Sequence, residues 1–77
     1  MANFFYFHVA YEVRLLEKNE RLKGDCLLRI KKGGDTSLAR IREMVAKEVV
    51  DTYHDKVTEA VLLSLTPLSK KVYEMLI

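Results

Sequence analysis

Hydrophobic and polar side chains alternate along residues 4–15. Aromatic and aliphatic residues recur at every second position from Phe5 to Leu15. A period of two with this composition is typical of a long β-strand. A polar segment at residues 17–20 breaks the pattern, and alternation resumes over residues 22–31. The pattern therefore predicts two strands joined as a hairpin.

The apolar positions also predict how these two strands pair. If residues 17–20 form the loop, each apolar residue on one face of the first strand lies opposite a small or apolar residue of the second. The expected partners are Leu15 and Leu22, Tyr11 and Cys26, Val9 and Leu28, and Phe7 and Ile30. On the other face, His8 is then expected opposite Arg29, and Tyr6 opposite Lys31.

A helix is expected over residues 37–54. Gly33-Gly34 ends the hairpin, and Asp35, Thr36 or Ser37 can each cap the helix by accepting a bond from an unpaired amide. The apolar stripe at helical spacing consists of Leu38, Ile41, Val45, Val49 and Tyr53. This stripe fits the side of a helix that packs on the hairpin.

The last part of the chain predicts a third strand and a short helix. Residues 58–65 are mostly apolar and follow a short turn, which indicates a largely buried strand. Ser69 is a candidate N-cap for a helix over residues 70–76. The expected buried face of this helix contains Val72, Tyr73 and Leu76. The pattern leaves open whether the helix covers the sheet.

These elements predict one α+β domain over residues 1–77, with the order ββαβ and a possible short C-terminal helix. A helix between the second and third strands favours a right-handed crossover, which makes those strands parallel. The third strand then pairs with the first, and the strand order is 2-1-3. One helix covers one face of this sheet. The other face has no clear cover.

The uncovered face is the candidate interaction surface. Its principal residues are expected to be Phe4, Tyr6, His8, Leu27, Arg29 and Lys31. Ala10, Ala60, Leu62 and Ser64 are expected beside them. An exposed apolar face of this kind favours a protein partner, which includes a second copy of the chain, or addition of a strand at a sheet edge. The alternative is nucleic acid, with aromatic rings stacking on bases and Arg29 and Lys31 binding phosphates.

Composition narrows the choice of partner and compartment. The net charge is +2, which is low for a nucleic-acid-binding protein, although residues 1–34 hold seven basic and four acidic side chains. Cys26 is the single cysteine, so no internal disulfide can form. No secretion signal or membrane-spanning stretch is recognisable, and a cytoplasmic protein of bacterial or phage origin is expected.

The sequence favours a protein without catalytic activity, metal or cofactor. Cys26 is expected on the helix-covered face, His8 on the other face, and His54 at the end of the helix, so these groups should not meet. A small nuclease with His8 or His54 beside a basic groove remains the enzymatic alternative. Residues 31–37 contain paired glycines, but their spacing indicates a capped turn rather than a phosphate-binding loop.

Overall fold

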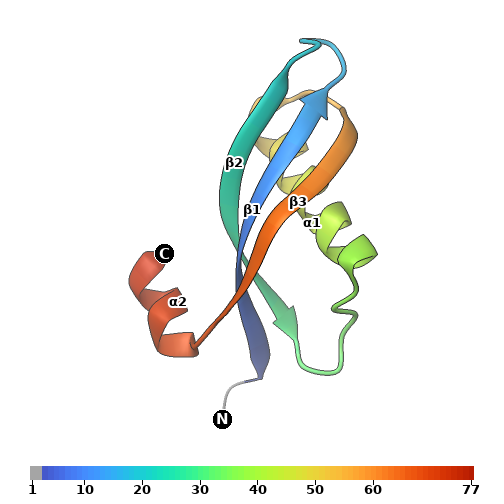
Figure 1. Ribbon diagram of the computed structural model, residues 1–77. Coiled ribbons are helices and arrows are strands. Elements are labelled where there is room, and N and C mark those ends of the chain that lie inside the picture. Colours follow the sequence, from blue (N-terminus) through green and yellow to red (C-terminus); the bar gives the residue numbers. More distant parts are fainter. Residues whose placement is uncertain (1–2) are drawn as a thin grey trace.

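The computed structural model describes residues 3–77 as a three-stranded sheet with helices on opposite sides (Figure 1). The elements follow one another as β1 (Phe4–Leu15), β2 (Arg21–Lys31), α1 (Leu38–Tyr53), β3 (Val57–Leu68) and α2 (Lys70–Leu76). The strand order is β2-β1-β3, and both outer strands are antiparallel to β1. The predicted fold class and strand order are therefore confirmed.

The main core lies between the sheet and α1. Ile41, Val45 and Val49 face the sheet and are almost fully buried, as the apolar stripe predicts. Leu38 and Tyr53, at the two ends of the stripe, are exposed, so their predicted burial is wrong. They pack with side chains from alternate positions of the strands, which include Val9, Tyr11, Val13, Leu15, Leu28 and Ile30. Burial of each aliphatic side chain contributes about 1.5–3 kcal/mol. The opposite face of the sheet is called the outer face below.

The hairpin register differs from the expected one by two residues. Val9 lies opposite Cys26, and Tyr6 lies opposite Arg29. The Leu15 N–H donates to the Glu20 carbonyl at 2.9 Å, so residues 16–19 form the loop. A shift by two residues keeps every side chain on its own face, so alternation alone does not exclude it. Within this loop, Asn19 adopts a left-handed φ of 49°, which few other residue types tolerate.

β3 is longer than predicted and contains a β-bulge. Its register against β1 shifts between Ala10 and Tyr11, which leaves Leu63 as an extra residue. A bulge interrupts alternation, so the residues on its two sides follow different patterns. Ala60 and Leu62 consequently pack against the α1 core. Their predicted place on the uncovered face is wrong.

Local capping sets both ends of α1. The Ser37 hydroxyl accepts a hydrogen bond from the Arg40 N–H at 3.2 Å. His54 ends the helix in the left-handed region with φ 55°, and its N–H donates to the Val50 carbonyl at 2.9 Å. The predicted range of residues 37–54 therefore begins and ends at the two cap residues of α1.

Asp55 joins the hairpin loop to the turn after α1. Its buried carboxylate accepts hydrogen bonds from the backbone N–H groups of Glu17 at 3.0 Å, Lys18 at 3.1 Å and Lys56 at 2.7 Å. The Glu17 bond is the main cause that lowers the pKa of Asp55, and the Lys18 and Lys56 bonds add to it. These contacts position the loop end of the β1–β2 hairpin.

Candidate interaction surface

Helix α2 covers one end of the outer face. Its Tyr73 ring lies 4.6 Å from the Tyr6 ring, centroid to centroid, and Tyr6 is only 8% exposed. Val72 and Leu76 were expected to be buried with Tyr73, but both are exposed, so this prediction is wrong. The helix spans barely two turns, and its one partly buried side chain is Tyr73. The sequence pattern gave no signal for choosing Tyr73 over its apolar neighbours.

Phe4 and Arg29 complete this end of the outer face. The Arg29 guanidinium lies 4.7 Å from the centroid of the Phe4 ring, a cation–π contact. The Phe4 and Tyr6 rings are 6.3 Å apart. Lys31 lies opposite Phe4 across the hairpin and is exposed. The structure thus brings together four of the six candidate residues, with the two tyrosine rings packed on each other.

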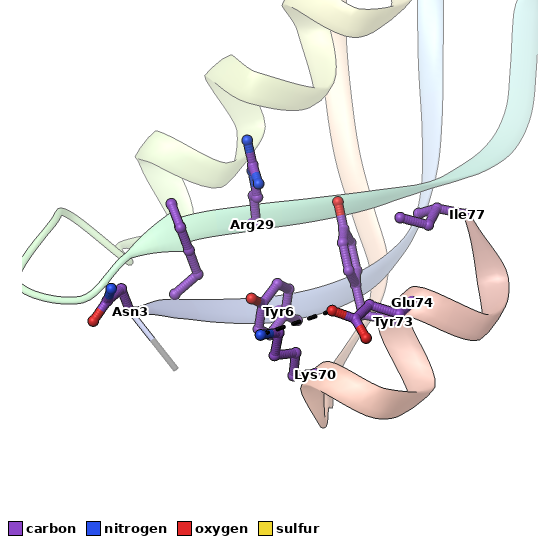
Figure 2. Close-up of a pocket in the computed structure, with 8 residues that line it drawn as sticks. Asn3, Tyr6, Arg29, Lys70, Tyr73, Glu74 and Ile77 are labelled. Carbon is purple, nitrogen blue, oxygen red and sulfur yellow. Dashed lines mark ion pairs between the residues drawn. The ribbon is translucent and has the colours of Figure 1, made fainter. Parts of the chain in front are cut away.

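A pocket of about 280 Å³ lies between α2 and this end of the sheet (Figure 2). It is lined by Asn3, Phe4, Tyr6, Arg29, Lys70, Tyr73, Glu74 and Ile77. Lys70 Nζ lies 3.8 Å from Glu74 Oε1, and Figure 2 marks this pair with a dashed line. Both signs of charge are present, so the pocket does not favour an anion strongly.

A second hollow, the central groove, lies further along the outer face. It has a volume of about 370 Å³ and is lined by His8, Asp25, Leu27, Thr66, Leu68 and Leu76. His8 Nε2 lies 2.8 Å from Asp25 Oδ2. The expected hairpin register did not predict this contact. It places Asp25 opposite Glu12, whereas Asp25 lies opposite Ala10 in the structure. The carboxylate orients the imidazole at the mouth of the groove.

The far end of the outer face is charged. Arg21 lies between two carboxylates, 3.8 Å from Glu12 and 3.9 Å from Glu59. Ser64 pairs with Ala10 nearby, as expected for this face. The outer face therefore changes from apolar and aromatic at the α2 end to polar and ionic at the hairpin-loop end.

The exposed side of α2 forms an apolar surface beside the central groove. It consists of Val72, Met75, Leu76 and Ile77. Met75 is 76% exposed and Leu76 is 57% exposed. Leu76 also lines the central groove together with Leu27 and Leu68. The apolar surface of α2 is therefore continuous with apolar side chains of the sheet.

The groups considered for catalysis lie apart. Cys26 packs against the α1 core, whereas His8 lies on the outer face and His54 ends α1. Burial raises the pKa of the Cys26 thiol to about 11, and the charges of Glu48 and Asp25 add to this shift. The thiol is therefore protonated at neutral pH and a poor nucleophile.

The paired glycines form the turn that leads into α1. The Gly34 N–H donates to the Lys31 carbonyl at 2.8 Å, and Gly33 has a φ of 89°. Asp35 accepts a hydrogen bond from the Ser37 N–H at 2.8 Å, which lowers the pKa of Asp35. These bonds match the capped turn expected from the sequence.

Comparisons with protein-family models, with curated proteins and with solved structures gave no match for this chain. Within residues 3–77, no three His, Cys, Asp or Glu side chains gather closely enough to hold a metal ion. Neither described helix is long and apolar enough to cross a membrane.

Proposed function

We propose that the chain is a non-enzymatic protein-interaction module that self-associates through its outer face and the adjoining sheet edge. The observation that supports this proposal is the apolar surface of α2, where Met75 and Leu76 are largely exposed beside the central groove. Large apolar side chains gathered in this way typically mark an interaction site. Single exposed apolar residues elsewhere on the molecule need no such explanation.

The size of the molecular surface also favours a partner. The chain exposes 5452 Å², whereas a compact monomer of this mass exposes about 4,800 Å². Its radius of gyration is 13.0 Å, against about 11.5 Å for a compact domain of this length. The chain therefore exposes about 650 Å² more than a compact monomer of its mass, and this extra surface is available for a partner.

The nucleic-acid alternative has less support from the geometry. Base stacking needs an accessible aromatic ring, but Tyr73 covers Tyr6 and the Arg29 guanidinium lies over Phe4. Basic groups on the outer face are also interrupted by Asp25, Glu12 and Glu59. A uniform positive track along the sheet is therefore absent from the described residues.

The proposal is tested by the mass of the protein in solution. Sedimentation velocity over a range of concentrations is expected to give twice the monomer mass at high concentration. Leu76→Glu should raise the dimer dissociation constant by on the order of 100-fold, because it places a charge in an apolar contact. Leu38→Glu is the matched control, since Leu38 is 55% exposed at the start of α1, on the other side of the sheet.

Three results would count against the proposal. A monomer at all concentrations would refute self-association. Equal weakening by the Leu76 and Leu38 substitutions would show that the outer face is not the contact. Binding of single-stranded oligonucleotides that falls steeply with salt would instead support the nucleic-acid alternative.

A further inference from the structure

We propose that the open edge of β2 binds an extended segment of another protein, in which acidic side chains alternate with apolar ones. This inference goes beyond the proposed self-association, which is supported by the apolar surface of α2. It follows from three features of β2: the backbone groups on its open side, the charges on its outer face, and a groove between β2 and α1.

The edge formed by β2 is better suited to the addition of a strand than the opposite edge. β3 has two register shifts against β1 and contains Pro67, and both features hinder the addition of another strand. β2 pairs with β1 without a shift from Arg21 to Lys31 and has no proline. Helix α1 also lies closer to β3 than to β2, so β2 is the more accessible edge (Figure 1).

The hairpin hydrogen bonds show which backbone groups face this edge. The Leu15 N–H donates to the Glu20 carbonyl, and hydrogen-bonded pairs alternate along an antiparallel ladder. Even-numbered residues of β2 therefore bond to β1. The N–H and C=O groups of odd-numbered residues, such as Leu27 and Arg29, point to the open side. An added strand would bond to these groups, which provides affinity without regard to side chains.

The side chains on the outer face of β2 favour an acidic partner. The odd-numbered residues include one acidic residue, Asp25, and four basic ones, which are Arg21, Lys23, Arg29 and Lys31. Asp25 is already bound to His8, and Arg21 lies near two carboxylates, which leaves three basic side chains for a partner. Opposite charges on neighbouring strands stabilise their pairing. A second copy of β2 would bring the same excess of basic charge, so an acidic segment of another protein complements this edge better.

A groove on the α1 side of β2 explains why the other side chains of the partner should be apolar. It has a volume of about 420 Å³ and is lined by Leu28 of β2, and by Met44 and five charged residues of α1. Leu28 and Met44 belong to the core or pack against it, whereas the charged residues are of both signs. Side chains of an added strand point alternately to the two faces of the sheet, so every second one would face this groove.

Designed peptides test the chemistry of the proposed partner. The probe is a fluorescently labelled peptide of 11 residues, the length of β2, in which glutamate and valine alternate. One control has the same composition with all glutamates in one half, and a second has lysine in place of glutamate. Fluorescence anisotropy is expected to give a dissociation constant about tenfold lower for the alternating glutamate peptide than for either control. Equal affinities for the three peptides would refute the proposal.

Nuclear magnetic resonance locates the bound peptide on the protein. The Leu27 and Arg29 N–H groups should become protected from hydrogen exchange, because they face the open side. The Leu28 N–H is bonded to β1 in both states and should change less. The Met44 methyl resonance should shift, whereas that of Met75 on the exposed side of α2 should not. A shift of Met75 without one of Met44 would place the peptide on α2 and overturn the assigned site.

Two substitutions separate backbone pairing from charge. Leu27→Pro removes an outward N–H without removing a bond to β1, and should weaken binding of the alternating glutamate peptide about tenfold. Lys31→Glu should weaken it about fivefold, because it places an acidic side chain beside the acidic segment. Lys56→Glu is the matched control for charge, since Lys56 is exposed just before β3, which forms the opposite edge. Equal effects of the two glutamate substitutions would show that net charge governs binding and would refute the site.

The outcomes separate this inference from the proposed function. A monomer that binds the alternating glutamate peptide would support this inference and refute self-association. A dimer that does not bind the peptide would support self-association and refute this inference. A dimer that the peptide dissociates would show that the β2 edge belongs to the contact between copies, which would overturn a separate partner for this edge.

Discussion

Replacing Tyr73 with alanine should destabilise the whole domain and release α2 from the sheet. Isolated helices as short as α2 are marginal in water, so α2 depends on its contact with Tyr6. The Tyr73 ring is partly buried against that of Tyr6, at 4.6 Å between centroids. If the truncation loses about 100 Å² of buried apolar area, the transfer cost is about 2.5 kcal/mol. An aromatic pair adds about 0.5–1.5 kcal/mol.

These values are upper bounds, because the unfolded chain already buries part of its apolar surface. We therefore expect Tyr73→Ala to lower the free energy of unfolding by about 2 kcal/mol. For a domain of this size, that corresponds to a fall in melting temperature of about 10 °C. Urea unfolding followed by far-UV circular dichroism measures the first quantity, at one fixed protein concentration because association adds to stability.

Tyr53→Ala is the control for this experiment. Tyr53 is 40% exposed on α1, and its ring has the Lys18 ammonium at 5.6 Å as a cation–π partner. Its loss should cost less than about 1 kcal/mol. Near-UV circular dichroism should change strongly for Tyr73→Ala, because the paired tyrosine rings are separated. Equal losses of stability in the two variants would refute the argument that α2 is held on the sheet by its tyrosine.

Three other predictions concern the α1 side of the sheet and the hairpin. The folded-state pKa of Cys26 is about 11, so little of the reactive thiolate is present at pH 8. Alkylation by iodoacetamide at that pH should therefore be on the order of 100-fold slower in the folded protein than in guanidinium. Equal rates in the two conditions would contradict this prediction. The lowered pKa of Asp55 means that its carboxylate stabilises the fold above about pH 4 and loses this effect as the pH falls through the folded-state value. Asp55→Asn should lower the urea midpoint at pH 7 and weaken the acid dependence, whereas a parallel pH profile would argue against this role. A Cβ at position 24 would lie 2.8 Å from the Tyr11 hydroxyl oxygen, so Gly24→Ala should destabilise the hairpin. Adding Tyr11→Phe removes that oxygen and should restore part of the lost stability. If the double variant is no more stable than Gly24→Ala alone, this clash is excluded.

Periodicity was sufficient for the order of elements but not for the pairing of strands. The stripe that includes Ile41 and Val45 predicts α1 because a helix must bury one side, and both residues are fully buried. The hairpin register was wrong by two residues, since such a shift leaves each residue on the same face. Asn19 lies in the loop of both registers, so its left-handed conformation does not distinguish them. The bulge at Leu63 has no local signal either, because Leu63 is apolar like Val61 and Leu62 before it.

The composition of the candidate surface was less predictable than the fold. Phe4, Tyr6 and Arg29 lie together as expected for adjacent strands, because alternation places them on one face. The contacts between them depend on register, so the His8–Asp25 pair and the position of Arg29 over Phe4 could not be derived from the expected pairing. The packing of Tyr73 on Tyr6 depends on the path of the chain after β3, which period-two and helical patterns do not describe.

The central position of β1 has a consequence for the rate of folding. The β1–β2 hairpin and α1 are made from neighbouring residues, but Tyr6 pairs with Leu68 near the opposite end of the sequence. Such distant pairing closes a long loop, and the entropy lost in closing it is offset only once the two strands are in contact. Folding is therefore slower than in domains with local contacts. Docking of β3 should therefore be the late step in folding. Until it occurs, the hairpin exposes unpaired strand edges on both sides, and refolding at high concentration should favour aggregation at this stage.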